Sequence, residues 1–152
     1  MNMNKKYGIF GLVLVVILAT VLISGCIDDE NNNKEFTKAI TVEGVTFFVP
    51  NDFNLENTQD NGINKETTYS DGINSITIFF YPNASKESLL SQMKSLATFS
   101  NIQEDVTIGG ISGHTAEGPV TKIFVFEKGG ETFAIELSEN LNFEEYVTKI
   151  IK

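Results

Sequence analysis

An uncharged apolar run near the N-terminus limits how much of this chain is left to fold as a globular domain. Residues Tyr7–Ile23 carry no charged side chain, and Lys5 and Lys6 stand just before them. A short basic segment followed by an apolar one is the layout of a secretory signal peptide. As an α-helix the run would be about 26 Å long, slightly less than the hydrocarbon core of a bilayer. We therefore expect residues 1–25 to be a signal peptide.

Cys26 is the only cysteine of the chain and directly follows the tripeptide Ile-Ser-Gly. A single cysteine excludes an internal disulfide and a zinc site built from cysteines. The stretch resembles the lipobox of prokaryotic lipoproteins, in which an aliphatic residue, a small residue and Gly or Ala precede the cysteine. This resemblance implies that Cys26 is the lipidated first residue of the mature chain. The alternative is an uncleaved transmembrane anchor in which Cys26 has no role.

The location of the chain can be inferred from either kind of anchor. Lys5 and Lys6 favour a cytoplasmic N-terminus, because basic residues next to an apolar segment stay on the cytoplasmic side. We therefore expect the rest of the chain at the cell membrane, facing the extracytoplasmic side.

The charge of the chain limits its partners. It has 20 acidic and 11 basic side chains, all of the latter lysine, and a net charge of −9 at pH 7. Residues 1–25 hold two of the lysines and no acid, so the remaining chain carries −11. Such a chain is repelled by nucleic-acid phosphates and by anionic lipid head groups. We expect no nucleic-acid partner, and membrane contact only through the lipid or the N-terminal anchor. The remaining partner would be an unknown envelope protein or ligand.

A change in composition divides residues 26–152 into two parts. Residues 26–38 are acidic, rich in Asn and nearly without apolar side chains, so they cannot bury a core. We expect them to be a flexible tether behind the lipid. Residues 39–152, about 114 residues, are enough for one globular domain with one core.

The pattern of residues 39–152 predicts an α+β domain. Apolar runs separated by Gly-containing turns indicate strands and hairpins. Apolar stripes at helical spacing, behind the capping residues Ser85 and Asn142, indicate two helices. We expect a mainly antiparallel sheet of about six to seven strands in the order ββββ-α-βββ-α, with the helices packed on the sheet faces. The strands are expected at 40–42, 45–49, 64–70, 75–81, 106–108, 121–127 and 132–137, with 51–61 irregular.

A four-residue segment recurs after ten residues, as Asn-Gly-Ile-Asn at 61–64 and Asp-Gly-Ile-Asn at 71–74. A tandem ligand site is one explanation. The same turn built twice, at the two ends of one strand, is the one that we favour, because Asn, Asp and Gly are the residues that tight turns use.

Ser112 and His114 are the candidate catalytic pair. They lie in Gly-Ile-Ser-Gly-His, and glycines beside a serine are typical of a nucleophile elbow. That motif requires Gly two residues after Ser, where this chain has His114. A lone His beside Gly in a β-rich segment is more often a turn or edge residue, so we predict no catalytic residue.

Three further features have weaker functional interpretations. Residues 52–56 alternate oxygen-bearing side chains, but Asn57 and Ile63 stand where a calcium loop of the EF-hand type needs Gly and an acid. Asn83 begins an N-glycosylation acceptor pattern, Asn-Ala-Ser. The 12 phenylalanines are expected mainly in the core, while Phe36 and Phe53, in polar segments, are the candidates for exposure.

The opening GVTFFVP and the later TIGGISGH, followed by a Phe-rich hairpin, resemble small archaeal and bacterial lipoproteins with a PsbP-like domain. The resemblance spans about residues 39–152 and implies a central antiparallel sheet with helices on its faces. It implies no single activity and no functional residue. We therefore expect a lipid-anchored, non-enzymatic binding or accessory domain that needs no cofactor or metal. The alternatives are an extracytoplasmic hydrolase using Ser112 and His114, and a module that binds divalent cations.

Overall fold

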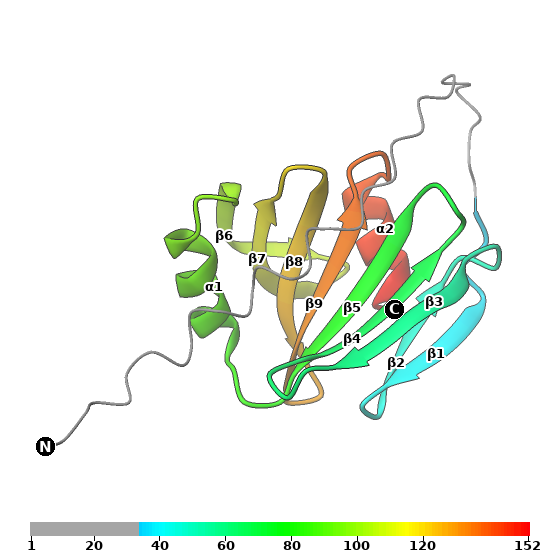
Figure 1. Cartoon of the computed structure of the whole chain (residues 1–152), viewed down its shortest axis with the longest axis horizontal. Coiled ribbons are helices and arrows are strands. Elements are labelled where there is room, and N and C mark those ends of the chain that lie inside the picture. Colours follow the sequence, from blue (N-terminus) through cyan, green and yellow to red (C-terminus); the bar gives the residue numbers. More distant parts are fainter. Residues whose placement is uncertain (1–33) are drawn as a thin grey trace, which may run out of the picture. The chain divides into compact units, whose positions relative to one another are not determined.

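The computed structural model describes residues 34–152, which form a mainly β domain (Figure 1). Strands make up 52% of these residues and helices 15%. The element order is βββββ-α-ββββ-α. The strands are β1 (Lys38–Val42), β2 (Val45–Val49), β3 (Asn54–Asp60), β4 (Lys65–Ser70), β5 (Ser75–Tyr81), β6 (Ser100–Ile108), β7 (Ile111–Glu117), β8 (Thr121–Lys128) and β9 (Glu131–Ser138), and the helices are α1 (Lys86–Ser95) and α2 (Phe143–Ile150).

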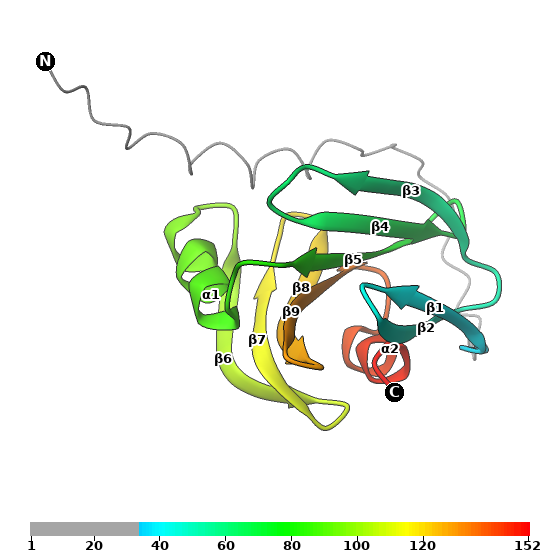
Figure 2. The same ribbon diagram turned by 90° about the horizontal axis from the view of Figure 1, so that it is seen from below.

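Seven of the strands form one sheet in the order β3-β4-β5-β9-β8-β7-β6, and every neighbouring pair is antiparallel. Two meanders, β3-β4-β5 and β6-β7-β8-β9, are thus joined where β5 pairs with β9. Strands β1 and β2 form a separate two-stranded sheet. The sheet curves, and Figure 2 shows α2 and the β1-β2 hairpin inside the curve, with α1 outside it.

The inner face of the sheet carries the main core. Cross-strand pairs such as Ile78 with Ile135 and Phe80 with Phe133 place large apolar side chains side by side on this face. Phe47 of the hairpin packs edge-on against Phe133, with 5.2 Å between ring centroids. The fully buried members of this core are Phe47, Val49, Phe53, Ile76, Ile78, Phe124, Phe126, Phe133, Ile135, Leu137, Val147 and Ile150.

Both helices begin where the sequence predicts a cap. The Ser85 hydroxyl accepts a hydrogen bond from the backbone N–H of Ser88, and Asn142 does the same for Glu145. Helix α1 buries Leu89, Leu90 and Met93 and packs on β7 and β8. Within residues 34–152, neither helix is long and apolar enough to cross a bilayer.

The predicted α+β class, with helices packed on the faces of a six- to seven-stranded sheet, is wrong. Residues 34–152 form nine strands, and the two-stranded β1-β2 sheet shares with α2 the covering of the inner face. The strand order ββββ-α-βββ-α is wrong because it omits β3 and β7. Strand β3 is exposed at every position, so its sequence has no apolar alternation, and β7 contains Gly113, which interrupts its pattern.

The repeated segments at 61–64 and 71–74 are one turn built twice, as predicted. In each, the first side chain accepts hydrogen bonds through Oδ1 from the backbone N–H groups two and three residues later. The two turns differ in one contact. Asn61 donates to Asn64 Oδ1, whereas Asp71 has no amide to donate, and Asn74 Oδ1 is left buried without a partner in the described part of the chain.

Candidate functional site

Lys34, the first residue that the structure describes, is fixed by two carboxylates. Its Nζ lies 2.8 Å from Asp52 Oδ2 and 2.7 Å from Asp71 Oδ2. It also lies 4.7 Å from the centroid of the Phe53 ring, a cation–π contact. Only 11% of the Lys34 side chain and 13% of the Asp71 side chain are exposed. We call Lys34, Asp52, Phe53 and Asp71 the Lys34 cluster.

The Lys34 cluster shifts the pKa of both partners in the direction of a stable ion pair. Burial lowers the pKa of Lys34, but the hydrogen bonds to Asp52 and Asp71 outweigh it and raise the pKa overall. Burial raises the pKa of Asp71, but hydrogen bonds from the Asn74 backbone and from Lys34 outweigh it and lower the pKa overall. Both groups are therefore charged at neutral pH, and they hold the start of the described chain against the β4–β5 turn.

Residues 34–37, predicted as part of the flexible tether, lie against the domain. Glu35 accepts a backbone hydrogen bond from Asn51, and the Phe36 ring packs edge-on against Tyr146 with 5.0 Å between centroids. The expected exposure of Phe36 and Phe53 is wrong. Phe53 is fully buried and Phe36 is partly buried against the core, because Lys34 and α2 cover these rings.

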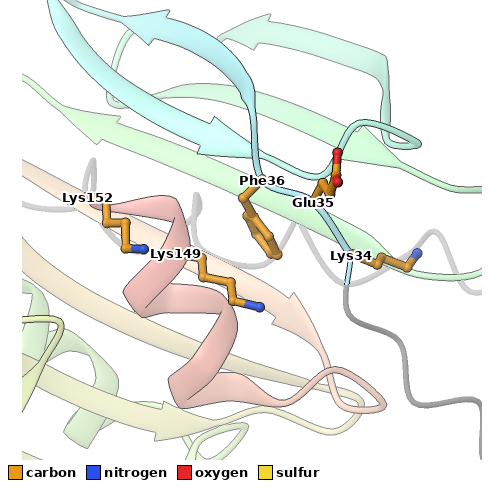
Figure 3. A pocket seen from close by; sticks show the side chains of 5 residues that line it. All are labelled: Lys34, Glu35, Phe36, Lys149 and Lys152. Atoms are coloured by element: carbon orange, nitrogen blue, oxygen red, sulfur yellow. The ribbon is translucent and has the colours of Figure 1, made fainter.

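A hollow of about 250 Å³ beside this segment is lined by Lys34, Glu35, Phe36, Lys149 and Lys152 (Figure 3). Three lysines around one hollow are typical of an anion site. Here two of them are paired, Lys34 with the aspartates of its cluster and Lys149 with Glu145 at 2.6 Å. The hollow therefore has little positive charge left for an anion.

Ser112 and His114 lie on β7, two residues apart, with side chains on the same face of the sheet. His114 is 2% exposed and Ser112 is exposed, and no hydrogen bond joins them. Nδ1 of His114 accepts a hydrogen bond from the backbone N–H of Asp105, 3.3 Å away. Nε2 is buried without a hydrogen-bond partner among residues 34–152 and lies 3.9 Å from Glu87 Oε1 on α1.

This arrangement does not favour the hydrolase. A neutral His whose Nδ1 accepts a hydrogen bond carries its proton on Nε2. The nitrogen that faces Glu87 is then a donor, and neither nitrogen is free to take a proton from Ser112. The flanking Gly113 has a packing role instead, since a Cβ there would lie 2.3 Å from the carbonyl oxygen of Val125.

A pair of carboxylates on the outer face escaped the predictions. Strand β5 separates Glu66 on β4 from Glu136 on β9, and the register puts both side chains on the face of Thr77 and Phe79. Burial, with the nearby Glu66 charge, raises the pKa of Glu136 to about 7. Burial also raises the pKa of Glu66. The sequence contains a signal for this pair, because Glu136 is an acid between Ile135 and Leu137 in the middle of an apolar strand.

The two edges of the sheet differ in their capacity to accept another strand. Strand β6 has two register shifts, and its Asn101 and Asp105 have φ of 47° and 53°, so its outer backbone is irregular. Strand β3 has one register shift, between Leu55 and Asn57, and is regular from there to Asp60. All seven residues of β3 are exposed. We call residues 57–60 the regular end of β3, and it is the more regular of the two sheet edges.

The remaining predicted sites are Cys26, Asn83 and the Asp52–Glu56 segment. Cys26 lies outside the described residues. Asn83 is exposed in the turn between β5 and α1, and Ser85 of the same acceptor pattern is the cap of α1. In the Asp52–Glu56 segment, Asp52 pairs with Lys34, and residues 34–152 contain no group of three or more metal-ligating side chains.

No family model matches the chain, and no curated protein matches it. The resemblance to PsbP-like lipoproteins therefore stays a prediction from the residue patterns quoted above.

Proposed function

We propose that this protein is a lipid-anchored, extracytoplasmic domain of the cell envelope that binds a partner and catalyses no reaction. The lipobox-like segment that ends at Cys26 supports the anchor, and the residual charge of −11 makes a covalent or inserted anchor necessary for membrane attachment. The hydrogen bond that Nδ1 of His114 accepts from Asp105 supports a non-enzymatic role over hydrolysis by Ser112 and His114.

The Lys34 cluster is the observation that carries this proposal. It fixes the entry of the chain into the domain at residue 34, four residues earlier than the tether was predicted to end. Seven residues then lie between Cys26 and Lys34, and the eight steps from one to the other span at most about 29 Å in a fully extended chain. A lipid on Cys26 holds the entry point close to the membrane surface, which suits a module that acts on a partner in the same membrane or next to it.

Fractionation of cells that express the full chain tests the anchor. The wild-type chain should stay in the membrane fraction, with a mature N-terminus at Cys26 that mass spectrometry finds lipidated. Cys26→Ala should block the modification, while Ser24→Ala, which keeps a small residue before the cysteine, is the matched control. An unmodified, uncleaved N-terminus in the wild-type chain contradicts the lipoprotein proposal.

Affinity purification of the full chain from detergent-solubilised membranes tests the binding role. A specific envelope partner should be recovered with the chain. Substitutions on the domain surface should reduce the amount recovered, and loss of the anchor should not. A chain that turns over ester or peptide substrates, and loses this activity in Ser112→Ala, contradicts the non-enzymatic role.

A further inference from the structure

We propose that the regular end of β3 pairs with an extended, basic segment of a partner protein, which joins the sheet as an additional antiparallel strand. This inference rests on the proposed binding role and names the surface and the chemistry of the partner.

The direction of the outward backbone groups of β3 is set by its pairing with β4. Asn61 donates its N–H to the carbonyl of Asn64, so these two residues form a hydrogen-bonded pair. Antiparallel pairs alternate between hydrogen-bonded and non-hydrogen-bonded along the ladder. Asp60 with Lys65 and Thr58 with Thr67 are therefore non-hydrogen-bonded pairs. The N–H and C=O groups of Thr58 and Asp60 point away from β4, toward the open side.

Within the described residues, the open side of residues 57–60 lacks three of the features that protect an edge strand. Such edges are usually blocked by Pro, by Lys, or by a bulge. From Asn57 to Asp60 the strand contains no Pro, no Lys and no register shift. The opposite edge, β6, is interrupted twice. Within residues 34–152, one edge of the sheet is thus interrupted, and the other is regular over the last four residues of β3.

The charge of β3 selects the kind of strand that fits. Glu56 and Asp60 are its charged residues. Glu56 has no ion pair within residues 34–152, and Lys65 lies 4.0 Å from Asp60 but 2.7 Å from Glu43. The edge is therefore acidic, and cross-strand pairs of opposite charge stabilise a sheet. An incoming strand with Lys or Arg at the position facing Asp60, and next to Glu56 in the adjoining bulge, is favoured.

A second copy of this chain fits less well. Two copies of β3 can pair through the outward groups of Thr58 and Asp60 in three antiparallel registers. In two of them Asp60 lies directly opposite, or diagonally next to, Asp60 of the other copy, and in the third it lies at the bulge that contains Glu56. Like charges at these positions destabilise the pair, so a basic partner strand is preferred to self-association.

Titration of the isotope-labelled full chain, in detergent, with a peptide of sequence Lys-Thr-Val-Lys-Val-Thr-Lys tests the proposal by NMR. The largest amide shifts should come from Thr58 and Asp60. Thr58→Pro removes an outward donor without touching the ladder to β4 and should weaken binding about tenfold or more. Thr58→Val, which keeps the N–H, is the matched control and should bind like the wild type. Asp60→Asn, which keeps the backbone, should weaken binding several-fold at low salt and less at high salt.

Shifts that map to another surface, equal binding by Thr58→Pro and Thr58→Val, or the same affinity for a peptide with Glu in place of Lys would each overturn the proposal. So would dimerisation of the free chain that Thr58→Pro abolishes, since that result assigns the edge to a second copy. The peptide titration does not depend on lipidation, so its outcome is separate from that of the fractionation experiment.

Discussion

The backbone N–H of Asp105 on β6 donates to Nδ1 of His114 on β7, with 3.3 Å between the nitrogens. Asp105 has a φ of 53°, so the ring of His114 receives an N–H from a left-handed residue inside an irregular edge strand. The buried histidine is thereby a structural acceptor for an edge strand whose own ladder is broken.

This contact predicts the tautomer of His114. The neutral ring should carry its proton on Nε2, because Nδ1 is occupied as an acceptor. The ¹⁵N chemical shifts of the two ring nitrogens measure this directly. A proton found on Nδ1 would contradict the contact and would make His114 a candidate base again.

Removal of the Asp71 charge should destabilise the domain. Asp71→Asn takes away one carboxylate of the Lys34 cluster and should lower the free energy of unfolding by about 1–3 kcal/mol at pH 7, measured by urea denaturation. The folded pKa of Asp71 lies below its unfolded value, so this stabilisation is complete above the unfolded value and is lost as the pH falls through the folded one. Asp52→Asn, at a carboxylate that is 54% exposed, should have the smaller effect. An equal loss of unfolding free energy in the two variants would show that burial of the Lys34–Asp71 pair does not strengthen it.

Glu136 should make the domain less stable as the pH rises. Its folded pKa of about 7 is higher than the ordinary 4.5, so the folded state binds more protons between these values and stability falls across that range. Glu136→Gln should therefore raise the free energy of unfolding at pH 8, on the order of 2 kcal/mol, and change it little at pH 4. Urea denaturation at both pH values checks this, with Glu139→Gln, just beyond the end of β9, as control. A gain in unfolding free energy of the same size at both pH values would show that ionisation of Glu136 is not the cause of the lower stability.

Gly113 should not tolerate a side chain. A Cβ at this position would meet the carbonyl oxygen of Val125 at 2.3 Å and the Phe124 ring at 2.5 Å, so Gly113→Ala must displace a central strand. We expect a loss of at least about 2 kcal/mol in thermal or urea unfolding. Gly72→Ala meets no atom within 4 Å and should lose only the strain of a φ of 92°, about 1 kcal/mol. Similar losses in both variants would contradict the packing role of Gly113.

Elements with local signals were predictable from the sequence. Both helix caps, the β5 strand with its apolar face and the two Asn/Asp-Gly turns depend on residues that are neighbours in the chain, and the structure has them where expected. Strand β3 could not be predicted in this way, because a strand that buries neither face needs no apolar alternation. The pairing of β5 with β9 also leaves no local trace, since it depends on how the rest of the sheet folds.

The candidate sites were predicted less well, for the same reason. Ser112 and His114 are on one face as their spacing requires, but the contact that assigns the proton comes from Asp105, on another strand. Lys34 belongs to a polar segment, and nothing in that segment shows that Asp52 and Asp71 would hold it. The open edge of β3 was invisible because the strand itself was not predicted.

The junction of β5 with β9 has a consequence for the order in which this domain can form. Ser75 and Ser138, which hydrogen-bond at this junction, are 63 residues apart in the chain. Long-range pairs of this kind form slowly, because a large loop must close before they stabilise anything. The β3-β4-β5 meander, synthesised first, has an unpaired edge at β5 until the last strand arrives. Folding therefore cannot finish until nearly the whole chain has emerged from the ribosome. During this interval the chain is still unfolded, and only an unfolded chain can be threaded through a membrane.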